Sequence, residues 1–239
     1  MGNFYSTQSL KLIEECERCA YDKIVLERER PSIPQAGLSY QLHDLLQALF
    51  DEYRANGATP PHLAPINAEL YPESAQYRKY RKGYTWRGKQ GNRLYGRLDE
   101  MVVRDGLVEA LDIKGKKRQP DESQIEDMVR LYRPQLNVYN YLLGKAGEKV
   151  GPNAHLLVAW LTGADDTRFS YDTMVVTIET DVKYTTTLLR RGLEIAKMKT
   201  PPPLNDDCKW CTHAKKAVKQ HEKEEKAKEK TVAEEKKVD

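Results

Sequence analysis

Two acidic residues and a lysine are spaced in the sequence so that they can share one site. They lie in the segments Gly96-Arg97-Leu98-Asp99 and Leu111-Asp112-Ile113-Lys114. Between these segments, Asp105-Gly106 joins two apolar runs and predicts a tight β-hairpin, so the two acids are expected on paired strands. Because side chains alternate along a strand, Asp112 and Lys114 should share one face, while Leu111 and Ile113 point into the core on the other.

This combination suits hydrolysis of a phosphodiester. Two neighbouring carboxylates repel each other near neutral pH, and burying either one unpaired is costly, so a divalent cation between them would stabilise both. The ammonium group of Lys114 could hold the attacking water or neutralise the charge that builds up on the phosphate. The alternative is a solvated strand edge on which Asp112 and Lys114 form an ordinary salt bridge.

Two further segments carry polar side chains on predicted helices. Residues 38–53 have apolar side chains at helical spacing, and His43 lies on the flank of that stripe. Downstream, Pro134 is expected to open a helix, which puts Gln135 and Tyr139 one turn apart on the same face. The imidazole could reach the acidic site, and the amide and phenol could bind a phosphate or a base. Alternatively, His43 is simply packed in the core and Tyr139 is half-buried.

Taken in order, these residues resemble a known family. His43, Gly96-Arg97-Leu98-Asp99, Asp112-Ile113-Lys114 and the pair Gln135 and Tyr139 are similar to the motifs of the RecB-type branch of the PD-(D/E)xK nuclease superfamily. The resemblance covers the chain from about the first helix to the last cysteine pair. Members of this branch include helicase-associated nuclease domains, CRISPR-adaptation exonucleases and phage recombination exonucleases. The fold that the resemblance implies is a restriction-endonuclease-like core.

The resemblance also implies roles for individual residues. The expected ligands of Mg²⁺ or Mn²⁺ are His43, Asp99, Asp112 and the carbonyl of Ile113. Lys114 would be the catalytic lysine, and Gln135 and Tyr139 would contact DNA near the cleaved bond. The implied reaction is attack of water on the phosphorus, leaving a 5′ phosphate, by an exonuclease of DNA recombination, repair or phage DNA processing. Glu109 is left out of the site because its odd offset from Asp112 puts it on the other strand face.

The four cysteines form two C-x-x-C pairs, Cys16 with Cys19 and Cys208 with Cys211. Two such pairs predict one four-thiolate metal site that joins the two ends of the domain. Several RecB-type nucleases bind a [4Fe-4S] cluster through one N-terminal and three C-terminal cysteines, so the resemblance favours that cluster. This chain departs from the pattern, because it offers two plus two cysteines. Such pairs are equally typical of structural Zn²⁺, which is the alternative, and His213 could replace a ligand. Disulfides are also conceivable, but no secretory signal precedes them.

The net charge of +3 is modest, so affinity for nucleic acid must come from local clusters. Residues 77–89 interleave cations with aromatic rings, a pattern typical of contact with a phosphate backbone and exposed bases. The candidate DNA-binding residues in this segment are Arg78, Lys79, Arg81, Lys82, Trp86 and Arg87. The alternative is a solvated basic loop whose tyrosines cover the core. The expected partners are DNA, as single strands or duplex ends, and a recombination or helicase protein.

The periodicity predicts an α/β fold, with a central mixed β-sheet flanked by helices. Helices are expected at residues 9–27, 38–53, 121–144 with an interruption near Pro134, and 182–199; strands are expected at 101–104, 107–114, 154–161 and 173–178. Residues 1–213 would form one nuclease domain, and the lysine- and glutamate-rich residues 214–239 a disordered tail or a single helix. No segment is long and apolar enough to span a membrane and no leader is visible, which predicts a cytoplasmic protein, in the host cytoplasm if viral.

Two other classes of function remain open at this stage. The chain could be a catalytically inactive DNA-binding or assembly module with the same fold. It could also be a structural protein with a metal clamp and an incidental pair of acids, in which case no activity would depend on Mg²⁺.

Overall fold

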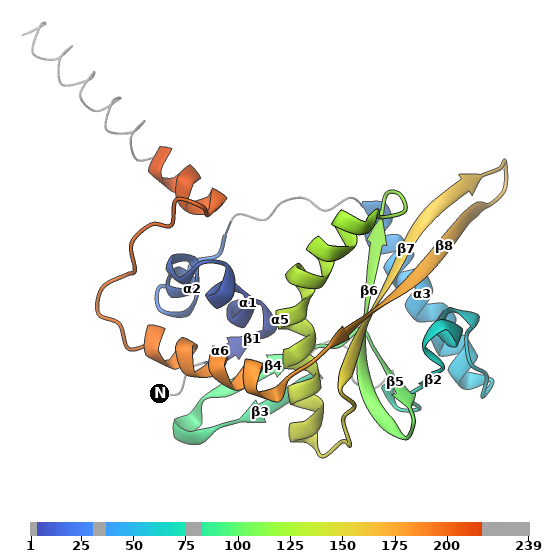
Figure 1. The fold of residues 1–239 in the computed structure, drawn as a ribbon, viewed down its shortest axis with the longest axis horizontal. Coiled ribbons are helices and arrows are strands. Elements are labelled where there is room, and N and C mark those ends of the chain that lie inside the picture. The colour runs from blue at the N-terminus through green and yellow to red at the C-terminus, as the bar shows by residue number, and fades with distance from the viewer. Residues whose placement is uncertain (1–3, 31–36, 75–82, 217–239) are drawn as a thin grey trace, which may run out of the picture.

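The computed structural model describes residues 4–30, 37–74 and 83–216. Its centre is a five-stranded sheet with the order β2-β5-β6-β7-β8 (Figure 1). The strands are β2 Glu69–Leu70, β5 Glu100–Arg104, β6 Leu107–Lys116, β7 Asn153–Ala164 and β8 Phe169–Glu179. Only β6 and β7 pair in parallel, and the other neighbours are antiparallel, so the sheet is mixed as predicted.

The hairpin between β5 and β6 forms at the predicted position. Asp105 and Gly106 both have positive φ angles, 52° and 73°. A two-residue turn with both φ angles positive matches the right-handed twist of the strands, which explains why the Asp-Gly pair is the turn. Glu100 of β5 therefore pairs with Leu111 of β6, and this register places Asp99 beside the middle of β6.

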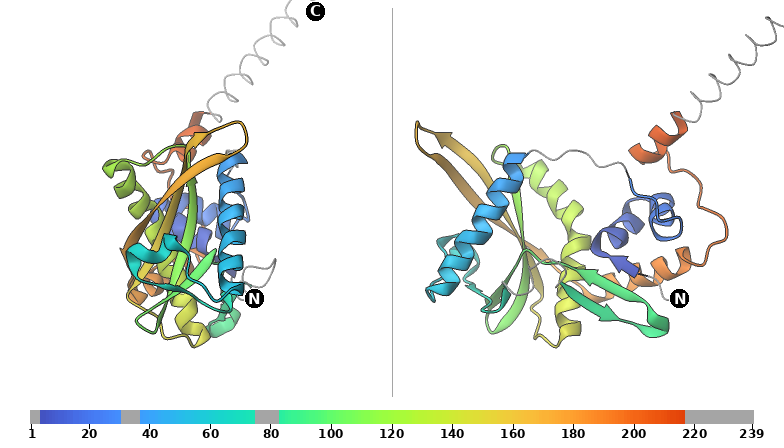
Figure 2. Two further views of the ribbon diagram at one scale, coloured as in Figure 1. Left: turned by 90° about the vertical axis from the view of Figure 1, so that its right-hand side faces the viewer. Right: turned by 180° about the vertical axis from the view of Figure 1, so that it is seen from behind.

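Both faces of the sheet are covered by helices, α3 (Gly37–Ala55) on one side and α5 (Glu122–Ala146) on the other (Figure 2). On the α3 side, the buried cluster includes Leu46, Phe50 and Ile113. The opposite side packs α5 against residues such as Ala110 and Leu156. The face that carries Asp112 is therefore also a core face, and the expectation that only the face of Ile113 is core-side is wrong.

Pro134 lies inside α5 and neither opens nor interrupts it. The helix begins at a capping box between Asp121 and Gln124 and ends at Gly147, whose φ is 100°. A proline inside a helix costs about 3 kcal/mol. Ten side chains of α5 are buried, which outweighs that cost, so tertiary packing overrides the local signal.

A second sheet of three strands, in the order β1-β4-β3, lies beside the N-terminal helices. Its strands are β1 Phe4–Ser6, β3 Tyr84–Arg87 and β4 Arg93–Gly96. Ser6 caps α1 (Thr7–Glu15), but the predicted helix 9–27 is broken. Cys16 has φ −170° and ψ 108°, so the chain starts again as α2 (Glu17–Ile24). The described residues also form α6 (Val182–Ile195), a helical segment at residues 209–216, and the 3₁₀ turns η1 (Pro61–Ile66) and η2 (Lys89–Gly91).

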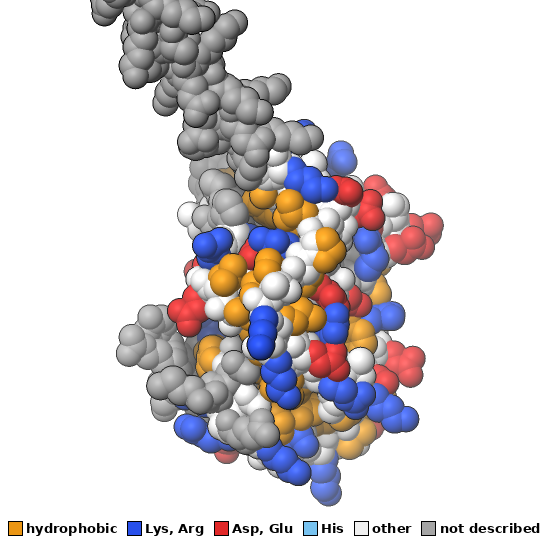
Figure 3. All heavy atoms as spheres, turned by 90° about the vertical axis from the view of Figure 1, so that its left-hand side faces the viewer, with side chains coloured by type: hydrophobic (Ala, Val, Ile, Leu, Met, Phe, Trp, Pro, Cys, Tyr) orange, Lys and Arg blue, Asp and Glu red, His pale blue; other side chains and the backbone are white. Residues whose placement is uncertain are grey.

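The surface of the described part is of mixed charge. Figure 3 shows one face, on which lysine and arginine side chains alternate with hydrophobic and acidic ones. None of the helices that the structure describes is both long and apolar enough to cross a bilayer. The proposed tail begins with helical residues 214–216, and the rest of it, residues 217–239, lies outside the described residues.

Candidate active site and thiol cluster

Strand β6 carries Asp112 and Lys114 on the face that packs against α5. The Nζ atom of Lys114 lies 2.5 Å from Oδ2 of Asp112 and 4.0 Å from Oδ2 of Asp99. The side chain of Asp112 is only 1% exposed. The predicted trio therefore converges on one point, and it is a buried cluster rather than a solvated strand edge.

Asp99 lies between β4 and β5 and is held from two sides. Its Oδ2 accepts a hydrogen bond of 3.0 Å from the backbone N–H of Ile113 and lies 3.2 Å from Nε2 of His43. One helical turn after His43, Gln47 donates a hydrogen bond of 3.1 Å to the carbonyl oxygen of Asp99. Helix α3 thus reaches the acidic site through two side chains, as the position of His43 on its flank predicts.

Helix α5 closes the other side of the site with Gln135 and Tyr139. The Nε2 atom of Gln135 donates to Oδ1 of Asp112 at 2.8 Å and to the hydroxyl of Tyr139 at 2.9 Å. The two residues do lie one turn apart on one face, even though the helix starts earlier than predicted. Gly96 makes this approach possible, because a Cβ there would lie 3.2 Å from Tyr139 and 2.7 Å from Leu142.

The two carboxylates differ in their affinity for a proton. Burial and the neighbouring charge of Asp99 raise the pKa of Asp112 to about 7, against the opposing charge of Lys114. Burial would also raise the pKa of Asp99, but the hydrogen bond from His43 and the charge of Lys114 outweigh it, so that pKa lies below its usual value. The hydrogen bond to Asp99 in turn raises the pKa of His43. Binding of a proton by Asp112 and the positive charge of Lys114 both reduce the repulsion between the carboxyl groups of Asp112 and Asp99.

Lys114 remains charged in this setting. Burial would lower its pKa, but the charges of Asp112 and Asp99 outweigh burial and raise it. Its ammonium group also lies 5.0 Å from the ring centre of Tyr132. Lys11 of α1 lies 5.4 Å from the same ring. Two cations thus flank one aromatic ring beside the acids, an arrangement that favours an anionic ligand.

The donor set fits a divalent cation. Oδ2 of Asp112 is buried, and its contact with Lys114 lacks hydrogen-bond geometry, so within the described residues this oxygen has no hydrogen bond. A buried carboxylate oxygen without a hydrogen bond is costly unless a cation lies beside it; here the ammonium group of Lys114 lies 2.5 Å away, and a divalent cation would suit the same position. His43, Asp99 and Asp112 are nevertheless spread more widely than a closed metal site, because they do not all bring a ligand atom within 4.8 Å of one another.

The predicted DNA-binding segment is described in part. Arg78, Lys79, Arg81 and Lys82 lie outside the described residues. Arg87 is exposed at the end of β3. Trp86 packs edge-on against Tyr141 of α5, with ring centres 5.7 Å apart, and is half-buried. This contact gives the tryptophan a packing role, and its role in binding DNA stays a prediction.

Gln47 and Tyr132 are site residues that the sequence reasoning missed. Gln47 could have been found, because it lies four residues after His43 and therefore on the same helical face. Tyr132 lies three residues before Gln135, a spacing that also puts two residues on one face of a helix. The expected start of the helix at Pro134 placed Tyr132 outside it and hid that relation.

Glu109 is buried on β6 but takes no part in this site. Its carboxylate binds the side chains of Arg104 and His155 at 2.8–3.1 Å. It also accepts a hydrogen bond from the backbone N–H of Asn153. The expectation that it lies on the other strand face from Asp112 is therefore confirmed.

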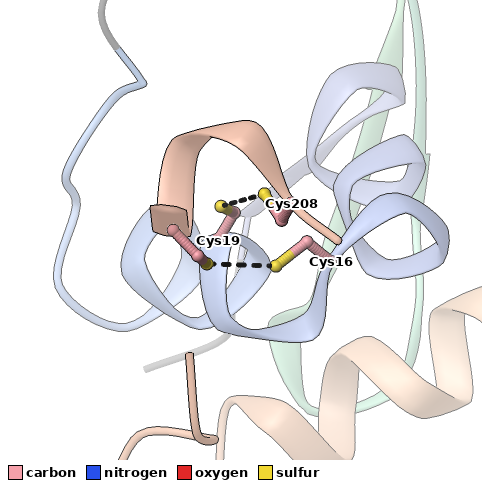
Figure 4. Close-up of side chains that lie close together, drawn as sticks. Cys16, Cys19 and Cys208 are labelled. Atoms are coloured by element: carbon pink, nitrogen blue, oxygen red, sulfur yellow. Dashed lines mark hydrogen bonds between the residues drawn. The ribbon is translucent and has the colours of Figure 1, made fainter. Parts of the chain in front are cut away.

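The four cysteines come together as predicted. Cys16 and Cys19 flank the start of α2, and Figure 4 shows them beside Cys208 of the C-terminal segment. The same segment carries Cys211. The sulfur atoms of Cys16 and Cys211 are 3.6 Å apart, and those of Cys19 and Cys208 are 3.7 Å apart. All four are free thiols and are buried. Their four sulfur atoms all lie within 4.8 Å of one another. Among the described residues, no other group of three or more metal-ligating side chains lies this close together.

Comparison with known proteins identifies the class. Residues 3–215 match the model of the PD-(D/E)XK nuclease superfamily. The chain therefore belongs to this superfamily, whose members are nucleases that act on nucleic acid and generally use divalent metal ions. A search of curated proteins gives no match. Among solved structures, the crystal structure of SSO0001 is similar at 16% identity over 88% of this chain and 84% of that chain, with a TM-score of 0.40.

Proposed function

We propose that this protein is a metal-dependent deoxyribonuclease of the RecB-type branch that removes nucleotides from DNA ends. The observation that carries the proposal is the position of Lys114, whose ammonium group lies 2.5 Å from one carboxylate and 4.0 Å from the other. A buried pair of acids with a lysine beside both suits metal-dependent hydrolysis of a phosphodiester, and membership of the nuclease superfamily supports the same reaction.

The residues that would hold Mg²⁺ or Mn²⁺ are His43, Asp99, Asp112 and the carbonyl of Ile113. The imidazole nitrogen of His43 favours Mn²⁺ over Mg²⁺, because it is a softer donor than oxygen. A bound cation would polarise the phosphate and make water a better nucleophile.

The side chains around the acids have separate tasks in this proposal. Because Lys114 is held in its charged form, it donates hydrogen bonds to the attacking water or to a phosphate oxygen and does not accept a proton. Gln135 fixes the orientation of Asp112 through its 2.8 Å hydrogen bond, and the hydroxyl of Tyr139 lies at the other end of the same amide. The proposed role of both residues is to contact DNA beside the cleaved bond.

The proposed catalytic unit is residues 1–213, which include the thiol cluster, and the charged segment 214–239 is proposed to lie outside it. DNA, as single strands or duplex ends, is the proposed substrate. Recombination, repair or phage DNA processing is the proposed setting, with a recombination or helicase protein as partner. The thiol cluster is proposed to bind a metal that holds the ends of the domain together. A [4Fe-4S] cluster and a single Zn²⁺ are the two candidates for it.

The test is digestion of end-labelled single-stranded and duplex DNA with Mg²⁺, Mn²⁺ or EDTA. We expect cleavage with either cation and none with EDTA. Lys114→Ala and Asp112→Ala should each lower the rate by about a hundredfold or more. Lys197→Ala is the matched control, because Lys197 is exposed at the end of α6, and it should cleave like the wild type.

Two results would contradict the proposal. Undiminished digestion by Lys114→Ala would show that the lysine has no catalytic role. Binding of DNA without cleavage under every metal condition would instead identify an inactive DNA-binding module of the same fold.

A further inference from the structure

We infer that the thiol cluster binds a single tetrahedral Zn²⁺ and not the [4Fe-4S] cluster that RecB-type relatives carry. The inference rests on the separations of the four sulfur atoms and on the groups around them. It concerns a site apart from the proposed active site, so it stands or falls independently of the nuclease activity.

The sulfur separations match one ion. Zinc binds thiolate sulfur at about 2.3 Å in a tetrahedron, which places the sulfurs about 3.8 Å apart. The contacts of Cys16 with Cys211 and of Cys19 with Cys208 are 3.6 and 3.7 Å, and no two of the four sulfurs are more than 4.8 Å apart. A [4Fe-4S] cluster holds four iron and four sulfide ions between its cysteines, so it must spread the four sulfurs more widely than one ion does.

The pairing of the cysteines points the same way. Each C-x-x-C pair contributes one sulfur to each of the two close contacts, so the two pairs interlock around one centre.

The surroundings suit a closed, structural ion. The four cysteines are 3–8% exposed and pack with Leu12, Leu204 and Trp210. Four thiolates around one Zn²⁺ carry two negative charges, and Nη2 of Arg30 lies 3.8 Å from the sulfur of Cys208, where it offsets part of them. With all four ligands supplied by the protein, no position is left open for water or substrate, as expected of a structural zinc site.

Zinc in this position would fix the N-terminal helices rather than take part in chemistry. The ion would tie the junction of α1 and α2 to the C-terminal segment. At the other end of α1, Thr7 lies against Gly96, which also borders Tyr139 of the candidate active site. Loss of the ion should therefore destabilise the domain first, and disturb Tyr139 only through α1.

The test is the metal content of the full chain, produced in medium supplied with both iron and zinc and purified without oxygen. We expect a colourless protein with one zinc per chain and no acid-labile sulfide. X-ray absorption at the zinc edge should show four sulfur neighbours at about 2.3 Å. Iron with an equal amount of sulfide and brown colour would overturn the inference, and so would a protein with free or disulfide-bonded cysteines and no metal.

Variants identify the ligands. Cys208→Ser should lose most of its zinc, while His213→Ala should keep all of it, because His213 is exposed beside the cluster. Since Cys208→Ser can fail to fold, cobalt exchange into the wild type provides a second measurement: the visible spectrum should be that of tetrahedral Co²⁺ bound by four thiolates. A spectrum of six-coordinate Co²⁺ would contradict the inference. Lys114→Ala should keep its zinc, which separates this result from the test of cleavage.

Discussion

Replacing Glu109 by glutamine should remove a strong electrostatic contribution to stability without touching the candidate active site. The carboxylate of Glu109 is 1% exposed. It accepts hydrogen bonds of 3.0 and 3.1 Å from the guanidinium of Arg104, lies 2.8 Å from Nε2 of His155, and accepts a third hydrogen bond from the backbone of Asn153. Glutamine has nearly the same shape, so the change removes the charge and leaves the packing in place.

The magnitude follows from the pKa of this carboxyl. Burial would raise it, but the hydrogen bonds to His155 and Arg104 outweigh burial and lower the pKa from 4.5 to about 2. This difference corresponds to about 3 kcal/mol of folding stability. Because the pKa is lower in the folded state, the contribution is present in full above the unfolded value of 4.5. It is lost as the pH falls from there towards 2.

The assay is unfolding by denaturant and by heat for Glu109→Gln and the wild type. At pH 7 the variant should lose about 3 kcal/mol, which lowers Tm by about 6–12 °C for a domain of this size. Glu179→Gln is the control, because Glu179 is exposed on β8 of the same sheet, and it should change stability by less than about 0.5 kcal/mol. The gap between variant and wild type should narrow as the pH falls from 4.5 towards 2.

Three results would refute this reasoning. Equal stability of Glu109→Gln and the wild type at pH 7 would show that the buried ion pairs contribute nothing. A stability gap that does not change with pH would show that the cause is packing and not charge. Loss of DNA cleavage at a temperature where the variant is folded would show that Glu109 belongs to the active site after all.

Two more predictions concern the walls of the site. Gly96→Ala should lower the free energy of unfolding by about 1–3 kcal/mol, measured by thermal unfolding, because the new Cβ would lie 2.7 Å from Leu142. Gly163→Ala is the control, because nothing lies within 4 Å of a Cβ there, and it should keep the wild-type stability. Equal stability of the two variants would contradict the close contact. Tyr132→Ala should slow DNA cleavage by about two- to thirtyfold, because the aromatic ring contacts the ammonium group of Lys114. Tyr132→Phe keeps the ring and should keep the wild-type rate. A phenylalanine variant as slow as the alanine variant would argue against a cation–π contact.

The sequence predicts the parts of this protein whose signals are local. The Asp105-Gly106 turn, the alternation along β6 and the helical spacing around His43 each depend on a few neighbouring residues, and each is confirmed. These signals predict that Asp99 and Lys114 lie on paired strands, and they leave open whether His43 reaches them; the structure places His43 3.2 Å from Asp99. The C-x-x-C spacing likewise predicts the thiol cluster, because few other arrangements use such pairs.

The predictions that fail depend on contacts between distant segments. Pro134 reads locally as a helix start, yet burial against the sheet carries α5 through it. The first helix breaks at Cys16, which adopts an extended conformation and whose sulfur meets Cys211, a partner 195 residues away. The buried pair of Glu109 and His155 depends on the parallel register of β6 with β7, which no local pattern reveals.

The distance along the chain between the two halves of the thiol cluster affects how the protein is made. Cys19 and Cys208 are 189 residues apart, so nearly the whole domain is translated between them. The first two thiols leave the ribosome long before their partners and must stay reduced in the meantime. The N-terminal helices can lock in place only after the last pair emerges, so any product truncated before residue 208 lacks this closure.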